Sequence, residues 1–291
     1  MSAPRRALPP TGAVSRPSAR RATAPRRARA LGWACAAVVV LVACSGGGVP
    51  AAIPASAAAT SPVATDAPPA QPVLPLAGRT VVLDPGHNGG NGSARGEVTR
   101  QVPDGRGGTK ACNTTGTSTD AGYAEHAFAW DLAQRVQARL TAAGARVVLT
   151  RPSDDGVGPC VDERGRAGQA AGADLMVSLH ADGSAAGNSG FHVAYSNPPL
   201  NPAQSGPAVV LAGDLRDALV AGGFRVSDYI GDDGLSPRPD LGGLNFATVP
   251  AALVECANMR NAAEAAVLAS ADGRERYAAA IAAGIQRFLA A

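Results

Sequence analysis

Hydrophobic and polar positions follow two different periods from about Leu76 to the end of the chain. Short apolar runs, each closed by a turn or a polar residue, predict strands at 80–84, 146–150, 174–179, 190–195 and 251–255. Longer stretches predict helices over about 121–143, 162–171, 207–221, 262–269 and 273–290. Because strands alternate with helices, we expect an α/β domain in which a mostly parallel, twisted sheet has helices on both faces.

The predicted helix over 121–143 has one apolar face, on which large side chains recur every four residues. These side chains are Phe128, Leu132, Val136 and Leu140. We expect Asp120 to cap the N-terminus of this helix and Gly144 to end it. Glu125 lies on the same face, three positions before Phe128. Because removing a carboxylate from water is costly, a buried Glu125 needs a partner, and a cation would supply one.

The stretch 88–120 follows neither period. It is rich in Gly, Thr and Asn and has no regular spacing of apolar residues, so we expect a long loop. Long loops without regular structure inside compact domains are usually functional or mobile. Our hypothesis is that this loop lies over a cleft and restricts access to it.

The first 44 residues have the pattern of an export signal. Residues 1–30 contain eight arginines and no acidic residue, and an apolar run of 14 residues follows at 31–44. This run is too short to span a bilayer as a permanent helix. Its end, the sequence LVACS at 41–45, is similar to a bacterial lipobox and predicts lipidation of Cys44. Cleavage after Ala57 and an uncleaved anchor are the alternatives, and each places the rest of the chain outside the cytoplasm.

Residues 45–76 separate the signal from the domain. They are rich in Ala, Pro, Ser and Thr, and seven prolines predict an extended, unpacked tether. The domain then occupies 77–291, and the apolar content of 46% over the whole chain allows a sizeable core. Without residues 1–30 the chain has 18 basic and 23 acidic residues, so its net charge changes from +3 to −5. This balance excludes nucleic-acid binding through a globally basic surface.

Candidate catalytic side chains stand at the carboxyl ends of the predicted strands. His87 lies just beyond the first strand, His180 follows 174–179, and Glu255 closes 251–255. In open α/β sheets, sites form outside these strand ends. With Glu125, two histidines and one carboxylate make up a common catalytic zinc set. Taken singly, each histidine could be a hydrogen-bonded structural residue, Glu125 could pair with an arginine, and Glu255 could be an ordinary buried carboxylate.

Four short segments carry a resemblance to a known family. They are VVLDPGHNGG at 81–90, LTRPSD at 149–154, SLHAD at 178–182 and VPAALVEC at 249–256. In this order they resemble the zinc-dependent N-acetylmuramoyl-L-alanine amidases of the Amidase_3 type, and the long loop and the cysteines look most like the secreted amidases of mycobacteria. The resemblance implies that His87, Glu125 and His180 bind one Zn²⁺ per chain and that Glu255 is the catalytic carboxylate. It also implies a structural role for Arg164.

The implied reaction is hydrolysis of the amide between the lactyl group of N-acetylmuramic acid and L-alanine. The partners would be peptidoglycan or muropeptides, and the membrane if Cys44 is acylated; we expect a monomer. In many family members fewer residues separate the first histidine from the ligand glutamate. Glu97 and His126 are therefore alternatives to Glu125 as a metal ligand. The rival functions are a non-catalytic peptidoglycan-binding lipoprotein and a zinc carboxypeptidase acting on stem peptides. His126 and His192 are otherwise expected to be surface or packing residues.

The cysteines outside the signal segment divide into a pair and a single residue. Cys112 and Cys160 lie in two predicted loops, and in an exported protein they are the natural disulfide. Cys256 follows Glu255 and therefore points to the opposite face of its strand. We expect Cys256 to be a buried free thiol.

Overall fold

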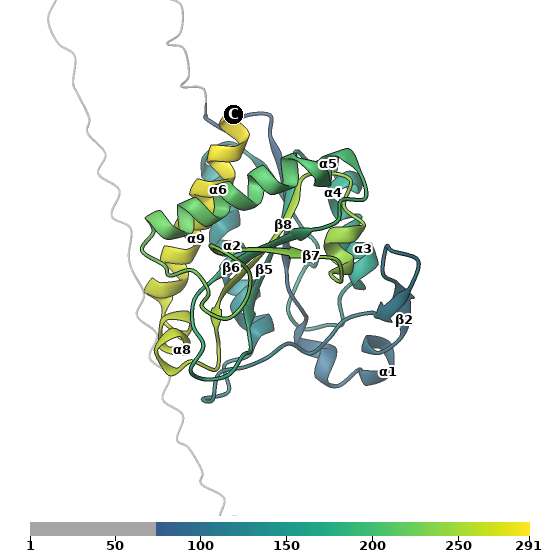
Figure 1. Ribbon diagram of the computed structural model, residues 1–291, viewed down its shortest axis with the longest axis vertical. Coiled ribbons are helices and arrows are strands. Elements are labelled where there is room, and N and C mark those ends of the chain that lie inside the picture. The colour runs from purple at the N-terminus through teal and green to yellow at the C-terminus, as the bar shows by residue number, and fades with distance from the viewer. Residues whose placement is uncertain (1–73) are drawn as a thin grey trace, which may run out of the picture. The chain divides into compact units, whose positions relative to one another are not determined.

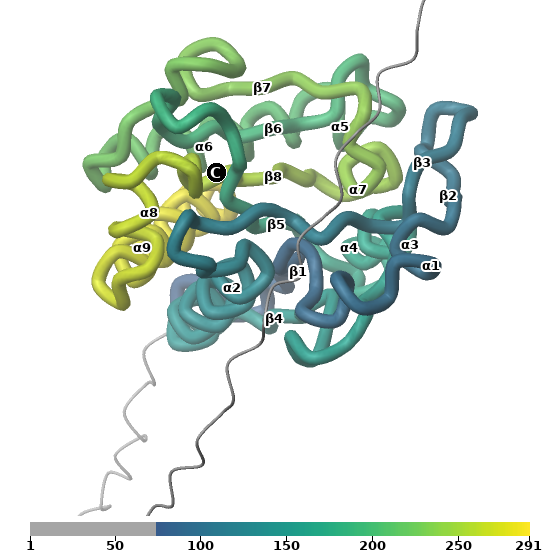
Figure 2. The backbone as a smooth tube through the Cα atoms, turned by 90° about the horizontal axis from the view of Figure 1, so that it is seen from below, coloured from purple at the N-terminus to yellow at the C-terminus, as the bar shows by residue number. Residues whose placement is uncertain are grey.

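The computed structural model describes residues 74–291, and a six-stranded sheet lies at its centre (Figure 1). The strands stand in the order β4-β1-β5-β8-β6-β7, which can be followed in Figure 2. Their bounds are Thr80–Pro85 (β1), Arg146–Leu149 (β4), Leu175–Asp182 (β5), His192–Ser196 (β6), Leu235–Arg238 (β7) and Ala251–Asn258 (β8). The predicted signal at 1–44, with Cys44, and nearly all of the tether lie outside the described residues.

The sheet is mostly parallel, as predicted. β1 pairs in parallel with β4 and β5, and β5 pairs in parallel with β8. β6 runs antiparallel to β8, and β7 is parallel to β6. The last two strands therefore form a reversed edge on an otherwise parallel sheet, an arrangement that is common in α/β folds.

Helices cover both faces of the sheet, but to different extents. The long helices α2 (Glu125–Ala142), α6 (Pro207–Ala221) and α9 (Ala271–Ala290), with α8 (Ala262–Ala269), enclose the larger core. The short helices α3 (Val161–Gly165), α4 (Ala167–Ala170) and α7 (Gly242–Asn245) cover the other face, which has a smaller core. Figure 1 shows α2 and α9 on one side of the strands and α3 and α4 on the other. Helix α5 (Pro202–Ser205) precedes α6.

Alternation along the central strands decides which side chains face the short helices. On β5, Leu175, Val177 and Leu179 belong to the larger core, and Met176 belongs to the smaller one. His180 has the same parity as Met176, because successive side chains of a strand point to opposite faces. By the same rule Glu255 shares a face with Leu253. Both candidate residues therefore lie on the sparsely covered face, where there is room for a cleft.

The stretch 88–120 is more structured than predicted. It contains a 3-10 helix (Gly89–Gly92), α1 (Arg95–Val98) and a hairpin of β2 (Gln101–Pro103) and β3 (Thr109–Ala111). The hairpin depends on turn chemistry rather than on apolar periodicity: Asp104 accepts hydrogen bonds from the backbone of Arg106 and Gly108. Gly105 has a positive φ of 84°, which favours glycine. The expectation of a long loop without regular structure was therefore wrong.

Several predicted boundaries also differ from the structure. Helix α2 begins at Glu125, and Asp120 forms an ion pair with Arg260 instead of capping it. β5 and β8 extend to Asp182 and Asn258, so His180 lies within its strand and not beyond it, and Glu255 lies inside its strand and not at its end. The predicted helix over 162–171 is two short helices. β7 was missed because it has only four residues, one of which is a proline.

The predicted disulfide between Cys112 and Cys160 is present, and Cys256 is a buried free thiol. The disulfide joins the segment after the hairpin to the N-terminus of α3. Within 74–291, no helix combines the length and the apolar character that crossing a membrane requires.

Candidate metal and catalytic site

His87, Glu125 and His180 come together although they are far apart in the sequence. One potential ligand atom from each lies within 4.8 Å of the others. Glu125 Oε1 is 3.1 Å from His87 Nε2 and 2.9 Å from His180 Nδ1. The three side chains are 5–16% exposed, so the cluster is largely shielded from bulk water. Neither competitor, Glu97 or His126, belongs to this cluster.

The residues around the cluster fix its orientation. His87 Nδ1 lies 3.1 Å from the carbonyl oxygen of Thr114, which favours the tautomer that leaves Nε2 free to bind a metal. The backbone N–H of Thr117 donates a hydrogen bond to Glu125 Oε2 at 2.9 Å. The loop that follows the hairpin therefore contacts a histidine and the carboxylate at the same time.

Two glycines allow the three side chains to approach the backbone closely. A Cβ atom at Gly86 would lie 2.3 Å from His180 Cε1, far inside van der Waals contact. At Gly116, which has a positive φ of 75°, a Cβ atom would lie 2.8 Å from Glu125 Oε2. A larger residue at either position would push a candidate ligand out of place.

The charges of the cluster favour a cation. Burial opposes ionisation of Glu125, but hydrogen bonds from His180 and His87 outweigh it and hold the pKa of this carboxyl well below its usual range. Burial opposes protonation of His87, yet its hydrogen bond to Glu125 raises the pKa of the imidazole. Two imidazoles and one carboxylate are the donor set of many catalytic zinc sites, which keep a fourth position for water. The residues present therefore fit a zinc ion.

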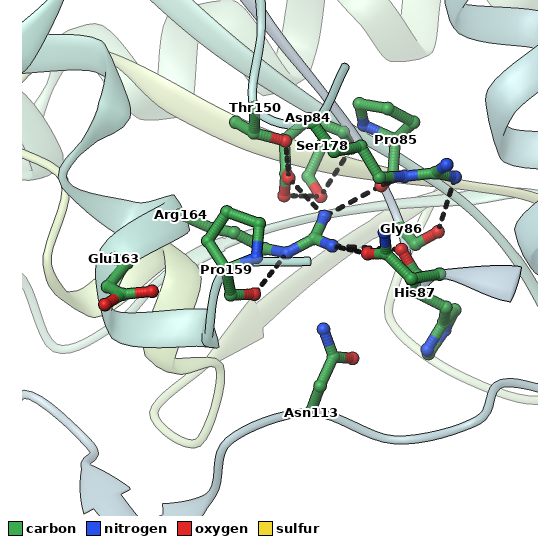
Figure 3. A network of polar contacts seen from close by, with 12 residues as sticks. Asp84, Pro85, Gly86, His87, Asn113, Thr150, Pro159, Glu163, Arg164 and Ser178 are labelled. Carbon is green, nitrogen blue, oxygen red and sulfur yellow. Dashed lines mark hydrogen bonds and ion pairs between the residues drawn. The ribbon is translucent and has the colours of Figure 1, made fainter. Parts of the chain in front are cut away.

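His87 is held in an unusual backbone conformation. Its φ of 54° lies in the left-handed region, which is uncommon for residues other than glycine. The buried guanidinium of Arg164 holds the backbone of the 85–87 turn. It donates hydrogen bonds to the carbonyl oxygens of Pro85 at 2.8 Å and His87 at 2.9 Å. Figure 3 shows this guanidinium between Asp84 and the His87 backbone. A second buried arginine, Arg151, donates to the same carbonyl of Pro85 at 3.0 Å.

Asp84 neutralises the charge of Arg164. Its Oδ1 atom lies 2.8 Å from Arg164 Nη1, and Thr150 and Ser178 donate their hydroxyl hydrogens to the same carboxylate (Figure 3). Burial alone would raise the pKa of Asp84, but the charge of Arg164 and these hydrogen bonds lower it. The structural role predicted for Arg164 thus has a specific form: it links a buried carboxylate to the turn that carries His87.

Glu255 lies one strand away from the cluster. It pairs in register with His180 across β5 and β8. The side chain is partly exposed, yet its Oε2 atom is buried and has no hydrogen-bond partner among the described residues. Burial, with the charges of Glu125 and Asp182, raises the pKa of this carboxyl well above its usual range. A carboxyl group with a raised pKa beside a metal site is suited to taking up and returning a proton.

The candidate residues open into a cleft of about 450 Å³ on the face of the short helices. The cluster and Glu255 line one part of it. The segment from Lys110 to Thr117 and helix α7 line another. The idea that the 88–120 stretch borders a cleft is thus supported by its position, although only its C-terminal part does so.

Four other residues weighed from the sequence lie outside the cluster. Glu97 is exposed in α1, and His126 pairs with Asp154 at 2.7 Å. Burial raises the pKa of the Cys256 thiol well above its usual range, which argues against a nucleophilic role. Of the two roles expected for His192, surface or packing, the structure shows the buried one, and His192 pairs in register with Glu255. Its place beside Glu255 was missed because the antiparallel register of β6 was unknown.

An α/β sheet that presents two histidines and two glutamates in one cleft has the architecture of a metallohydrolase. Residues 81–287 match the Amidase_3 family model, described as N-acetylmuramoyl-L-alanine amidase. The chain is 51% identical over 215 residues to the N-acetylmuramoyl-L-alanine amidase Rv3717 of Mycobacterium tuberculosis, covering 74% of this chain and 88% of that protein.

Solved structures agree with these matches. The amidase Ami1 of Mycobacterium smegmatis has a TM-score of 0.71 and 51% identity, covering 74% of this chain and 98% of that one. The apo form of Ami1 from Mycobacterium abscessus has a TM-score of 0.71 and 49% identity, with coverages of 73% and 99%. The chain therefore belongs to the N-acetylmuramoyl-L-alanine amidase family of cell-wall hydrolases. The family, fold class and enzyme class predicted from the sequence are confirmed.

Proposed function

We propose that this cleft hydrolyses the amide bond between the lactyl group of N-acetylmuramic acid and the L-alanine of a peptidoglycan stem peptide. His87, Glu125 and His180 hold one zinc ion, and Glu255 acts as the general base. The observation that carries this proposal is the convergence of the three donors within 4.8 Å, with Glu255 in register beside His180. A zinc ion held there would supply Lewis-acid chemistry, lowering the pKa of water and stabilising negative charge on the amide oxygen.

Glu255 handles the proton in both halves of the reaction. Its carboxylate removes a proton from the attacking water while the new C–O bond forms at the amide carbonyl carbon. The C–N bond then breaks, and Glu255 returns the proton to the departing nitrogen of L-alanine. The products are the free lactyl carboxylic acid and the intact stem peptide, so atoms and protons balance. A raised pKa suits this cycle because the group must gain and lose a proton near neutral pH.

The domain organisation inferred from the sequence gives this activity its location. Residues 1–44 are proposed as an export signal with lipidation at Cys44, 45–76 as a tether and 77–291 as the catalytic domain. The disulfide between Cys112 and Cys160 supports this location, because such bonds persist in oxidising compartments outside the cytoplasm. In this arrangement a monomer on the outer face of the membrane, or released from it, reaches peptidoglycan directly.

The test uses residues 74–291 loaded with zinc and a soluble N-acetylmuramoyl peptide, with products identified by mass. Wild type should release free N-acetylmuramic acid and the intact peptide, and Glu255→Gln should bind zinc but lose nearly all turnover. His180→Ala should also lose zinc. Cleavage inside the peptide would favour the carboxypeptidase alternative. If the protein binds the soluble peptide and polymeric peptidoglycan but cleaves neither, the non-catalytic binding lipoprotein would be favoured.

A further inference from the structure

His192 stands beside Glu255 on the side away from the metal cluster. β6 and β8 are antiparallel, and His192 and Glu255 are directly paired across them. On its other side Glu255 is in register with His180 of the parallel strand β5. Because paired residues of neighbouring strands point to the same face, the three side chains form one row across the sheet. His180 belongs to the candidate ligand set, whereas His192 has no role in the mechanism described above.

Both members of the His192–Glu255 pair have an unsatisfied polar atom. His192 is only 2% exposed, and its Nδ1 has no hydrogen-bond partner in the part of the chain that the structure describes. The same is true of Glu255 Oε2. Buried polar atoms are nearly always hydrogen-bonded to protein or to ordered water, so two orphans demand an explanation. Directly paired residues have Cβ atoms only about 4.5–5.5 Å apart, which places these two groups close enough for one water molecule to bridge them.

The surroundings of His192 fix its ring and keep it neutral. The ring of Tyr229 meets it edge to face, with centroids 6.3 Å apart. The Tyr229 hydroxyl donates to Asp182 Oδ2 at 2.9 Å, which anchors this tyrosine to the strand of His180. Burial lowers the pKa of His192 to about 4. A neutral imidazole carries one N–H donor, and an ionised carboxylate only accepts, so the two groups are complementary.

We propose that His192 is a positioning residue for Glu255. Its Nδ1–H supplies the hydrogen bond that Glu255 Oε2 lacks, through one bridging water molecule. The other oxygen, Oε1, is thereby directed toward the cleft, where it exchanges the proton with the attacking water and the leaving nitrogen. This inference rests on the proposed function, because it concerns the same base.

Three substitutions in the zinc-loaded holoenzyme test the role of His192. His192→Phe keeps an aromatic ring but removes both nitrogens. We expect kcat to fall about 10–100-fold, the usual effect of losing a group that orients a catalytic residue, with KM within about twofold of wild type. His192→Asn places an amide near the position of Nδ1 and should recover most of kcat. His192→Gln places its amide near Nε2 and should recover less. Zinc content should be unchanged in all three.

The result that overturns the inference is a kcat within twofold of wild type for His192→Phe, or equal kcat values for all three variants. Val193→Ala is the matched control, because Val193 is buried on the same strand but faces the opposite core. It should lower the melting temperature without a selective loss of kcat, so general damage to β6 is recognisable. Glu255→Gln belongs in the same assay: if it keeps activity, the proposed function fails, whereas an inactive Glu255→Gln beside an active His192→Phe refutes this inference alone.

Discussion

The two sides of the cleft are built in different ways. On the side of β1, the ligand side, His87 is hydrogen-bonded to Thr114 and Glu125 is hydrogen-bonded to Thr117. Two buried arginines hold the turn between β1 and His87. On the side of β8 and β6, the base side, the candidate base Glu255 and its neighbour His192 each have a buried atom without a hydrogen-bond partner among residues 74–291. The ligand side chains on the first side are hydrogen-bonded within the fold, whereas the two orphan atoms on the second side are not.

This difference matches the tasks that we propose for the two sides. Metal ligands must be held in a fixed geometry before the ion arrives, and hydrogen bonds to their free atoms achieve this. A general base must instead exchange protons with water and substrate, so its oxygens cannot all be occupied by permanent protein donors. Because the candidate ligands are held by hydrogen bonds that also stabilise the fold, substitutions on their side should affect stability and metal binding together.

The largest expected effect follows from removing the arginine on the ligand side. Arg164→Met leaves Asp84 buried without its ion-pair partner and frees the turn that carries His87. Breaking a buried pair in this way typically costs about 3–5 kcal/mol. We expect the free energy of unfolding in urea to fall by this amount, and zinc to be lost to a competing chelator at lower concentration. A variant with wild-type stability and zinc affinity would show that the two sides do not differ as described.

The disulfide supports the same side from a distance, and its removal should have the next largest effect. Cys112 lies two residues before Thr114, the hydrogen-bond partner of His87, and Cys160 immediately precedes the helix that contains Arg164. Its 48-residue separation implies a stabilisation of about 2–4 kcal/mol by restriction of the unfolded chain. Thermal unfolding of the Cys112→Ser/Cys160→Ser variant should therefore begin at clearly lower temperature. An unchanged melting temperature, or one that reductant lowers equally in wild type and variant, would contradict this role.

Much of this architecture could be predicted from the sequence because it depends on periodicity. The apolar runs of β1, β5 and β8 indicated a buried parallel sheet, and the position of Glu125 on the apolar face of its helix indicated a buried carboxylate. His87, His180 and Glu255 were then placed together by one rule, that sites form at the carboxyl ends of parallel strands. None of these steps needed to know which residues contact each other across long separations.

The features that were missed depend on such contacts. Arg164 pairs with Asp84 across 80 residues, and neither residue shows this in its local pattern. The hairpin of β2 and β3 is too short to have a period, and its turn depends on Asp104 and the conformation of Gly105. His192 could be placed beside Glu255 only once the antiparallel register of β6 and β8 was known. Sequence periodicity therefore does not reveal long-range polar pairs or the register of the strands.

A pH titration of the metal-free protein examines the other side of the cleft. The pKa of His192 is lowered by burial to about 4, from 6.5 in the unfolded chain. Between these values the unfolded state binds the extra proton, so the free energy of unfolding should fall as the pH decreases from about 6.5 toward 4. At pH 5 the lowered pKa of His192 reduces the free energy of unfolding by about 2 kcal/mol, compared with its value at neutral pH. His192→Phe should show a flatter dependence, measured by urea unfolding at several pH values; identical slopes would contradict the assignment.

The smallest expected effect comes from an arginine on the base side, and it completes the contrast with Arg164. Arg238 pairs with Asp240, whose side chain is 57% exposed, and such exposed pairs contribute less than about 1 kcal/mol. Arg238→Met should therefore leave unfolding and zinc affinity almost unchanged.

Its effect should appear in the pH profile of turnover instead. Burial raises the pKa of Glu255, and the positive charge of Arg238 partly opposes that rise. Without this charge the pKa of Glu255 rises further. Since the base must be ionised to accept a proton, the acid limb of kcat/KM should move to higher pH in the zinc-loaded Arg238→Met variant. A shift to lower pH, or a loss of stability comparable to that of Arg164→Met, would mean that the two sides of the cleft are not built on different principles.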